Sequence, residues 1–231
     1  MIVSHKHKFI YIKTNKTASS SVEIALVPLC GPDDIITPTA DEFMSMRGAS
    51  PARNWRLEHP LVPKRSLLRR LLRRPERYYH PTVGFYEHMP AWRVKAYVGD
   101  AVWNDYFKFT FERNPWDRQV SWWLHRTRAK NKRPSFEDFM GRSRRKAFVN
   151  NWELYTIDGK VAMDFIGRYE RLADDFQAVL QRIGLEGAAT LPISNVTDRS
   201  GNAYQSFYND RTRDTVAQWY AAEIAHFGYT F

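Results

Sequence analysis

Lysine and hydroxyl side chains crowd one short segment near the start of the chain, KFIYIKTNKTASSSVE at 8–23. The apolar run Phe9–Ile12 predicts a buried strand, and the apolar pattern after Ser21 predicts a helix. A strand that leads through a polar loop into a helix is suited to binding phosphate, because the first N–H groups and the helix dipole both favour an anion. Lys16 adds a positive charge. Hydroxyl donors follow at Thr17, Ser19, Ser20 and Ser21.

This loop differs from the mononucleotide-binding pattern GxxxxGK[ST], because it contains no glycine. It resembles instead the 5′-phosphosulfate loop of sulfotransferases that use 3′-phosphoadenosine 5′-phosphosulfate (PAPS), where the sequence is close to PKTAGTS. Asn15 replaces the proline of that pattern, Ala18 matches its alanine, and Ser19 replaces its glycine. Because serine tolerates positive φ less well than glycine, we expect a slightly different loop path. An ordinary helix cap is the alternative, since Ser and Thr are preferred there.

A second segment, YFKFTFERNPWDRQVS at 106–121, strengthens the resemblance. Alternating phenylalanines predict a strand, and Pro115 suits the first turn of a following helix. The pattern FxxxRNPxDRxxS resembles the 3′-phosphate-binding element of the same sulfotransferases, which implies that Arg113 and Ser121 hold the 3′-phosphate. Arginine suits this task because its planar fork binds phosphate oxygens bidentately. The alternative is that Asp117 and Arg118 only stabilise a helix start.

The resemblance extends over nearly the whole chain and is poorest over 38–79. The segment MDFIGRYERL at 163–172 looks like the family's strand-then-helix element, and the tail from 208 with HFGY at 226–229 looks like its closing helix. The subgroup most similar is that of the Golgi-type carbohydrate sulfotransferases and their bacterial relatives.

Strands alternate with helices along the chain, which predicts an α/β fold with a mostly parallel sheet flanked by helices. The resemblance implies a three-layer, P-loop-like arrangement. Ligands of such sheets bind at the carboxyl ends of the strands, where both motifs fall. We expect one domain over 1–231, with the proline-broken segment 39–79 as a lid or insertion. The expected strands are 9–12, 107–111 and 162–166, with a further short strand at 35–36. The expected helices include 92–98, ended by Gly99, 136–140, 145–155, 170–183, stopped by Gly184, and 208–226. A turn is expected at Asp158-Gly159.

Composition sets wider bounds. The single cysteine, Cys30, excludes an internal disulfide and favours a reducing compartment. We see no signal peptide and no long apolar run, so we expect a soluble cytoplasmic enzyme without a membrane span, although the Golgi relatives carry an anchor. No His/Cys cluster has metal-ligand spacing, so no metal is expected.

The net charge of +10 is concentrated in two segments. Residues 64–77 hold seven basic and one acidic residue, and residues 124–146 hold nine basic and two acidic residues. If these basic segments surround the binding site, they could steer PAPS or an anionic acceptor into it. The run SLLRRLLRRPERYY could also form an amphipathic helix that contacts a membrane surface or a partner. Alternatively it is only the solvated face of a helix, which is the interpretation we favour. No nucleic-acid motif accompanies the charge.

Sulfuryl transfer depends mainly on positioning and charge stabilisation, by analogy with phosphoryl transfer. Lys16 is the candidate to meet the charge on the leaving phosphate. The acceptor hydroxyl needs a general base. In the similar enzymes a histidine before the corresponding helix has this role, which implies His88, although a capping or core histidine is an equal alternative. Other candidates for the base are Glu87, His59 and His80. Arg199, in a late loop, could close over the 3′-phosphate or lie in a solvent-facing turn.

The sequence therefore predicts a PAPS-dependent sulfotransferase that releases 3′-phosphoadenosine 5′-phosphate (PAP) and sulfates an acceptor, more plausibly a carbohydrate hydroxyl than a small phenol. One alternative is a nucleotide kinase or another P-loop phosphotransferase. Another is a non-enzymatic basic module that binds nucleic acid or anionic glycans. The acceptor, the sulfated position and the oligomeric state are left open by the sequence.

Overall fold

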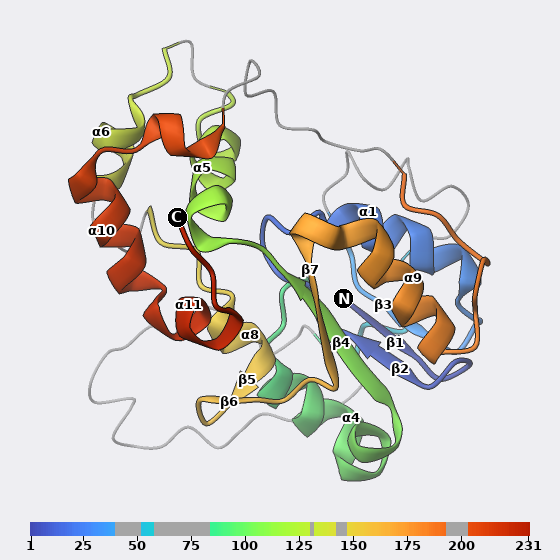
Figure 1. Ribbon diagram of the computed structural model, residues 1–231. Coiled ribbons are helices and arrows are strands. Elements are labelled where there is room, and N and C mark those ends of the chain that lie inside the picture. Colours follow the sequence, from blue (N-terminus) through green and yellow to red (C-terminus); the bar gives the residue numbers. More distant parts are fainter. Residues whose placement is uncertain (40–51, 58–83, 130–131, 142–146, 193–202) are drawn as a thin grey trace.

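The computed structural model describes residues 1–39, 52–57, 84–129, 132–141, 147–192 and 203–231 (Figure 1). Some expectations from the sequence lie outside these ranges. They are the positions of Arg199, His59 and His80, the basic segment 64–77, and all of the expected lid over 39–79 apart from residues 39 and 52–57.

A five-stranded sheet forms the centre of the described structure, in the order β3-β1-β2-β4-β7. β2, β4 and β7 are parallel, whereas β1 is antiparallel to both β2 and β3. The sheet is therefore mixed, and the prediction of parallel strands holds for the three that precede the recognised motifs. The strands are β1 (Ile2–Ser4), β2 (Phe9–Tyr11), β3 (Ile35–Ile36), β4 (Phe107–Glu112) and β7 (Phe165–Arg168).

β1 was not predicted as a strand of its own. Only four residues separate it from β2, which is too short for a parallel crossover, so the two strands must form a hairpin. Asp34 supports the turn: its carboxylate accepts from the backbone N–H groups of His5 and Lys6 at 2.7 and 3.0 Å. The sheet therefore begins one strand earlier than the motif strand.

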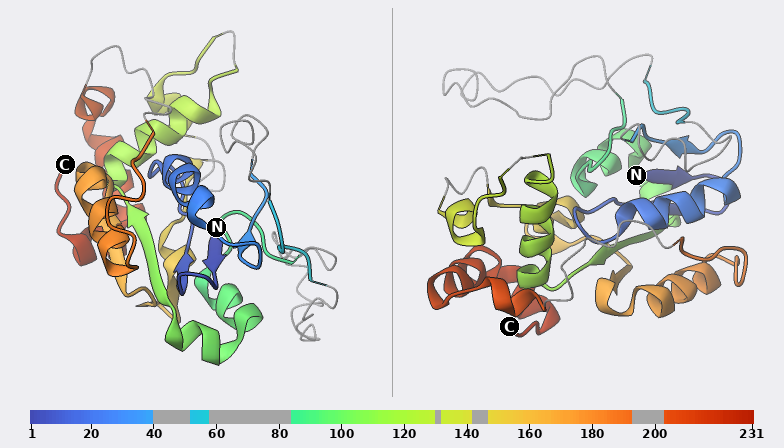
Figure 2. Two further views of the ribbon diagram at one scale, coloured as in Figure 1. Left: turned by 90° about the vertical axis from the view of Figure 1, so that its right-hand side faces the viewer. Right: turned by 90° about the horizontal axis from the view of Figure 1, so that it is seen from above.

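Helices cover both faces of the sheet. Phe9 and Tyr11 point to a core shared with α1 (Ser19–Leu26) and α9 (Leu172–Arg182), whereas Ile10 and Ile12 point to a core shared with α4 (Ala91–Asp105). Both faces are buried because successive side chains of a strand alternate. Figure 1 shows α1 and α9 as neighbours over one face, and Figure 2 shows the same pair from two other sides.

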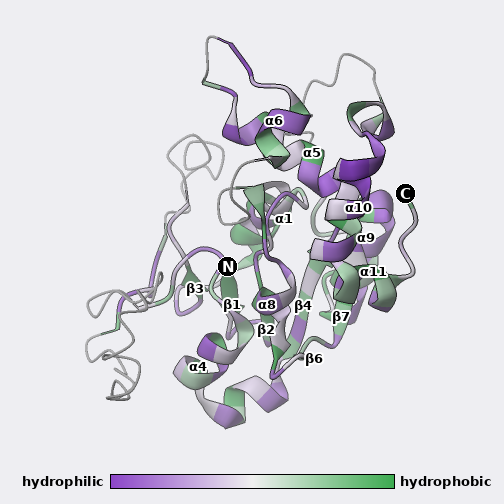
Figure 3. Cartoon of the chain, turned by 90° about the vertical axis from the view of Figure 1, so that its left-hand side faces the viewer, coloured by the Kyte–Doolittle hydropathy of each residue, from purple (hydrophilic) through white to green (hydrophobic). Residues whose placement is uncertain are grey.

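A second group of helices packs around a separate aromatic core at the side of the molecule away from α1 and α9 (Figures 1 and 2). Trp123 and Phe136 meet edge to face there, with ring centroids 5.6 Å apart. Figure 3 shows hydrophobic colour along the sheet strands and hydrophilic colour on α10. The group consists of α5 (Pro115–Arg126), α6 (Phe136–Met140), α10 (Asp210–Trp219) and α11 (Ala221–Phe227).

Several element boundaries differ from the prediction. Gly99, with φ 81° and ψ 162°, kinks α4 but does not end it, since the chain re-enters a helix up to Asp105. The expected final helix is broken into α10 and α11 at Tyr220, whose backbone leaves the helical region with φ −116°. The turn at Asp158-Gly159 is confirmed and joins the hairpin β5 (Thr156–Ile157) and β6 (Lys160–Val161), which follows α8 (Trp152–Tyr155).

The strand between β6 and α9 was predicted, but its expected start differs from the observed one. β7 begins at Phe165, three residues after the expected start, and Gly184 ends the α9 segment with φ 72°, as expected. Among the helices of the described ranges, none combines the length and the apolar composition needed to cross a membrane.

Candidate active site

The two motifs meet because their strands are neighbours. β2 and β4 pair in parallel with Tyr11 opposite Phe109, so the loops that follow them leave the same edge of the sheet. Two threonine hydroxyls join the loops to the strands: Thr14 donates to the Phe111 carbonyl at 2.6 Å, and Thr110 donates to the Ile12 carbonyl at 2.7 Å. The loop after β2 is therefore fixed against the end of β4.

Residues 13–18 form a tight loop that ends at the start of α1. Lys16 and Ala18 both have left-handed backbone conformations, with φ 61° and 56°. Ala18 is the cap residue of α1, and its side chain has no oxygen with which to cap the first N–H groups. The ordinary Ser/Thr cap is therefore wrong for this helix, and its first turn presents N–H groups and the positive end of the dipole to the loop. Ser19 does not adopt a positive φ, so it does not itself divert the loop.

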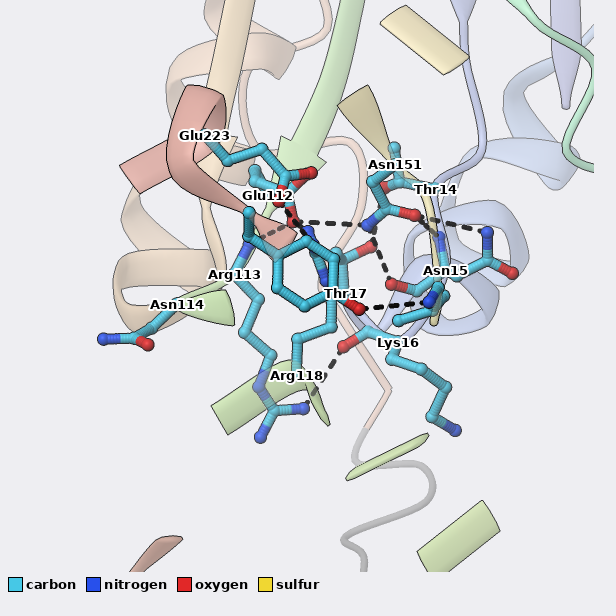
Figure 4. Close-up of polar contacts among 12 residues, drawn as sticks. Thr14, Asn15, Lys16, Thr17, Glu112, Arg113, Asn114, Arg118, Asn151 and Glu223 are labelled. Carbon is cyan, nitrogen blue, oxygen red and sulfur yellow. Dashed lines mark hydrogen bonds and ion pairs between the residues drawn. The ribbon is translucent and has the colours of Figure 1, made fainter. Parts of the chain in front are cut away.

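The hydroxyls of the loop and the first turn lie at different depths. Thr17 is fully buried and its hydroxyl is 2.9 Å from that of Thr14. Ser19 and Ser21 are buried in the first turn of α1, and Ser20 is half-buried beside them. Lys16 is also half-buried, and Figure 4 shows its side chain extending to the same side as that of Arg113.

Arg113, directly after β4, connects the second motif to the first. Its Nη1 donates to the Lys16 carbonyl at 3.2 Å, and its Nε and Nη2 contact the Asp117 carboxylate at 2.7 and 2.6 Å. The guanidinium also lies over the Tyr169 ring, 3.8 Å from its centroid. These contacts with described residues occupy three of the five N–H groups of a guanidinium, so two are left to meet an anion. Asp117 and Tyr169 therefore orient a side chain that retains binding capacity.

Arg118 has a different environment. It is fully buried, donates to Glu112 and, at 2.6 Å, to Glu223 of α11, and lies over the Tyr220 ring. Burial raises the pKa of Glu223 to about 7, although Arg118 opposes that shift. Arg118 is thus a structural residue that joins the end of β4 to α11 rather than one that stabilises a helix start, whereas Asp117 does lie in the first turn of α5. Ser121 lies two turns into α5 and is buried.

The other segments of the family pattern converge on Asn114. Its side-chain oxygen caps α5 by accepting from the Trp116 N–H at 3.0 Å, and its side-chain amide donates to the Thr230 carbonyl at 2.9 Å. Its backbone N–H donates to Glu170 at 2.7 Å. Glu170 belongs to the YERL turn and Thr230 to the tail, so three separated motifs meet at this residue, and the contact of Arg113 with Lys16 brings the loop to the same end of β4.

His88 lies beside the start of the loop. Its Nδ1 is 2.9 Å from the Lys13 carbonyl, and because a carbonyl only accepts, Nδ1 must carry the proton when the ring is neutral. Burial lowers the pKa of His88 to about 4, with Glu87 opposing and Lys13 adding to the shift. The neutral ring then has an unprotonated Nε2, which no described residue hydrogen-bonds, and this is the form required of a general base.

The segment that carries His88 packs closely against the backbone at Trp55. Phe85 N–H donates to the Trp55 carbonyl at 2.7 Å, and a Cβ on Gly84 would lie only 2.2 Å from that carbonyl oxygen. Glycine is therefore required at position 84 for this path. His88 itself adopts a left-handed backbone conformation, with φ 54°.

Glu87, the neighbouring candidate for the base, is bound to Lys13. The buried Lys13 ammonium contacts Glu87 at 2.5 Å and Glu23 at 2.6 Å. Burial pushes the pKa of Glu87 up, but Lys13 and His88 outweigh it and leave the pKa below its usual value. Oε1 of Glu87 is engaged by Lys13 and by the Thr39 hydroxyl, whereas no described residue hydrogen-bonds Nε2 of His88, so the geometry favours His88. In the described part of the chain, no group of three or more His, Cys, Asp or Glu residues could hold a metal ion.

Comparison with known proteins identifies the class. The model of the sulfotransferase family matches residues 1–230, so this chain belongs to the sulfotransferase family. The chain is also similar to an uncharacterized protein of Archaeoglobus fulgidus, with 38% identity over 114 residues, which is 48% of this chain and 94% of that protein. No solved structure shows a significant match. Family membership supports an enzyme that transfers sulfuryl groups.

Two contacts of the site were not predicted. The stacking of Tyr169 on Arg113 could have been suspected from the YERL segment, since aromatic faces attract guanidinium groups. Asn151, which bonds to the loop at Asn15, carries no motif of its own, and no sequence signal identifies it.

Proposed function

We propose that this sulfotransferase uses PAPS as its donor and transfers the sulfuryl group to an acceptor hydroxyl on a carbohydrate. One observation carries the donor assignment. Arg113, from the element that resembles a 3′-phosphate site, donates at 3.2 Å to Lys16, in the loop that resembles a 5′-phosphosulfate site. Two elements far apart in sequence therefore form one anion-binding surface.

The residues present fit a ligand with phosphates at two ends. At the 5′ end, a helix start without a side-chain cap offers N–H groups, and Lys16 offers a positive charge. At the 3′ end, Arg113 keeps two N–H groups and Ser121 adds a hydroxyl. Arg199 remains part of the proposal as a group that closes over the 3′-phosphate. The 5′ contacts are assigned to Lys16, Thr17, Ala18, Ser19, Ser20 and Ser21.

PAPS, when bound, supplies a sulfuryl group whose bond to the 5′-phosphate oxygen breaks as sulfur bonds to the acceptor oxygen. The acceptor proton passes to Nε2 of His88, and the products are PAP and a sulfate ester. Lys16 stabilises the charge that develops on the 5′-phosphate. The hydrogen bond from Nδ1 to the Lys13 carbonyl keeps the His88 ring in the tautomer that accepts this proton.

The finer features of the proposal rest on resemblance and composition. The carbohydrate acceptor follows from the Golgi-type subgroup, and the three-layer, P-loop-like arrangement follows from the family. We further propose one domain over 1–231, with 39–79 as the lid that selects the acceptor. A single cysteine favours a reducing, cytoplasmic compartment.

The test is transfer itself. The protein is incubated with PAPS and a panel of oligosaccharides, and mass spectrometry detects products that have gained one sulfuryl group together with released PAP. We expect sulfation of at least one oligosaccharide, and His88→Ala should lower turnover about 10²-fold or more while PAP binding stays intact. His7→Ala, at a half-buried histidine of the N-terminal hairpin, is the matched control.

Two outcomes would contradict the proposal. Transfer of phosphate from ATP without use of PAPS would favour a phosphotransferase. Unchanged turnover in His88→Ala would refute the assignment of the base and leave the donor assignment standing.

A further inference from the structure

The amide of Asn151 makes every hydrogen bond that an asparagine side chain can make. Oδ1 accepts from the backbone N–H and the side-chain amide of Asn15, at 2.8 and 3.2 Å. Nδ2 donates to the Asn15 carbonyl at 3.0 Å and to Glu112 at 3.2 Å. Figure 4 shows Asn151 between Glu112 and Asn15. The residue is fully buried, so these four bonds are shielded from water.

The orientation of this amide is unique. If it were reversed, its NH₂ group would face the Asn15 N–H, and its oxygen would face the Glu112 carboxylate. Both contacts would be repulsive, so only one rotamer satisfies the network. Asn151 therefore holds both sides of the Asn15 residue, its N–H and its carbonyl, in one fixed position.

The segment that carries Asn151 is itself held by α5 and α10–α11. Gln119 of α5 donates to the Ala147 carbonyl at 2.8 Å, and the Tyr220 hydroxyl donates to Gln119 at 2.7 Å and accepts from the Val149 N–H at 3.0 Å. These contacts are buried and close around residues 147–149. Asn151 thus projects from a rigid support.

The loop needs such support because it contains no glycine. Lys16 and Ala18 adopt left-handed conformations, which are unfavourable for any residue with a Cβ. The backbone bonds of Asn15 precede both strained positions. A proline at position 15, as in the family pattern, would lack the N–H that donates to Asn151. In this chain Asn15 supplies that N–H.

We propose that Asn151 is a positioning residue that holds the loop in the shape that binds the 5′-phosphate end of the donor. This inference rests on the proposed function, since it assumes a donor with phosphates at both ends. Asn151 acts through Asn15 and touches no ligand. It also joins the loop to Glu112, which accepts from the Arg113 backbone N–H at 2.8 Å, so one amide sets the spacing of the two phosphate-binding elements.

The test separates the two ends of the ligand. Asn151→Asp, a near-isosteric change, replaces both donors with an oxygen that faces the Asn15 carbonyl and Glu112. Calorimetry measures its affinity for PAP and for adenosine 3′-phosphate, which lacks the 5′-phosphate. We expect PAP affinity to fall about tenfold, the worth of one to two hydrogen bonds, while affinity for adenosine 3′-phosphate is unchanged. The neighbouring Asn150→Ala, at a half-buried position, is the control and should bind both ligands normally.

A milder variant covers the case in which Asn151→Asp does not fold. Asn15→Ala removes one of the four bonds, and we expect a smaller loss of the same selective kind. If affinity for both ligands falls equally, or if affinity for PAP does not fall, the inference about Asn151 is wrong. The proposed function still stands in that case, provided that the wild-type protein binds PAP. Failure of the wild type to bind PAP would overturn both.

Discussion

Each of the two segments proposed to bind phosphate carries a pair of cations with contrasting environments. Lys13 and Arg118 are buried, and each lies between two carboxylates, Glu23 and Glu87 for the first and Glu112 and Glu223 for the second. Lys16 is half-buried at the loop, and Arg113, although also buried, contacts a single carboxylate and the Lys16 carbonyl. Cations of one motif therefore divide into those that hold the fold and those that we propose to face the donor.

This division has a physical cause. A buried cation requires compensating charge, because its desolvation is otherwise too costly, and two carboxylates supply that charge. A cation that binds an anionic ligand must keep donors available, as Arg113 does with two of its N–H groups. Among these four cations, the number of surrounding carboxylates, rather than the place in a motif, separates the structural role from the proposed ligand-binding role.

Removing a structural cation should have the largest effect. Arg118→Met leaves Glu112 and Glu223 buried without their partner, so we expect the free energy of unfolding to fall by about 3–5 kcal/mol in urea denaturation. Lys8→Met, at an exposed ion pair with Asp105, is the control and should change stability little. A loss from Arg118→Met as small as that of the control would remove the distinction between the two classes of cation.

Removing the donor-site lysine should impair activity rather than stability. Lys16→Ala is expected to lower kcat/KM about 10²–10³-fold, because a positive charge no longer meets the leaving phosphate. The assay follows PAP release in the presence of an acceptor from the panel, and the melting temperature should stay close to that of the wild type. If the Lys16→Ala protein is unfolded, or if it is fully active, Lys16 does not belong to the cations that face the donor.

A conservative change at Arg113 sharpens the comparison further. Arg113→Lys keeps the charge but loses the planar fork, so PAP affinity should fall about tenfold. Affinity for adenosine 5′-phosphate, which lacks the 3′-phosphate, should be nearly unchanged in the same calorimetric experiment. Equal losses for the two nucleotides would show that Arg113 does not read the 3′ end.

Lowering the pH should affect turnover less than any of these substitutions. His88 acts as a base only when neutral, and burial lowers its pKa to about 4 from an ordinary value of 6.5. As the pH falls, kcat should therefore hold through 6.5 and reach half its maximum near pH 4. A half-maximum near 6.5 would indicate a base with an ordinary pKa.

Much of the site could be predicted because its residues follow strands. The alternation at Phe107, Phe109 and Phe111 identified β4, and Pro115 identified the start of α5. Both motifs therefore fell at the correct edge of the sheet. The antiparallel β1 was missed because three residues give too short a pattern, and Gly99 was taken as a helix end because a kink and an end share the same signal.

The roles of individual side chains were harder to predict. Lys13 and Lys16 are three residues apart and alike in sequence, and only long-range partners such as Glu87 separate them. Asn151 depends on a contact across 136 residues that no local pattern encodes. His88 was selected by resemblance, and its carbonyl contact gives that choice a geometric basis that remains to be tested.

The most direct measurement is a calorimetric titration of the wild-type protein with PAP and, separately, with ATP at moderate salt. The donor site proposed here requires PAP to bind selectively, and that binding should be lost in Arg113→Ala. Equal or preferential binding of ATP, or PAP binding that survives Arg113→Ala, would contradict the assignment of these two motifs to a PAPS site.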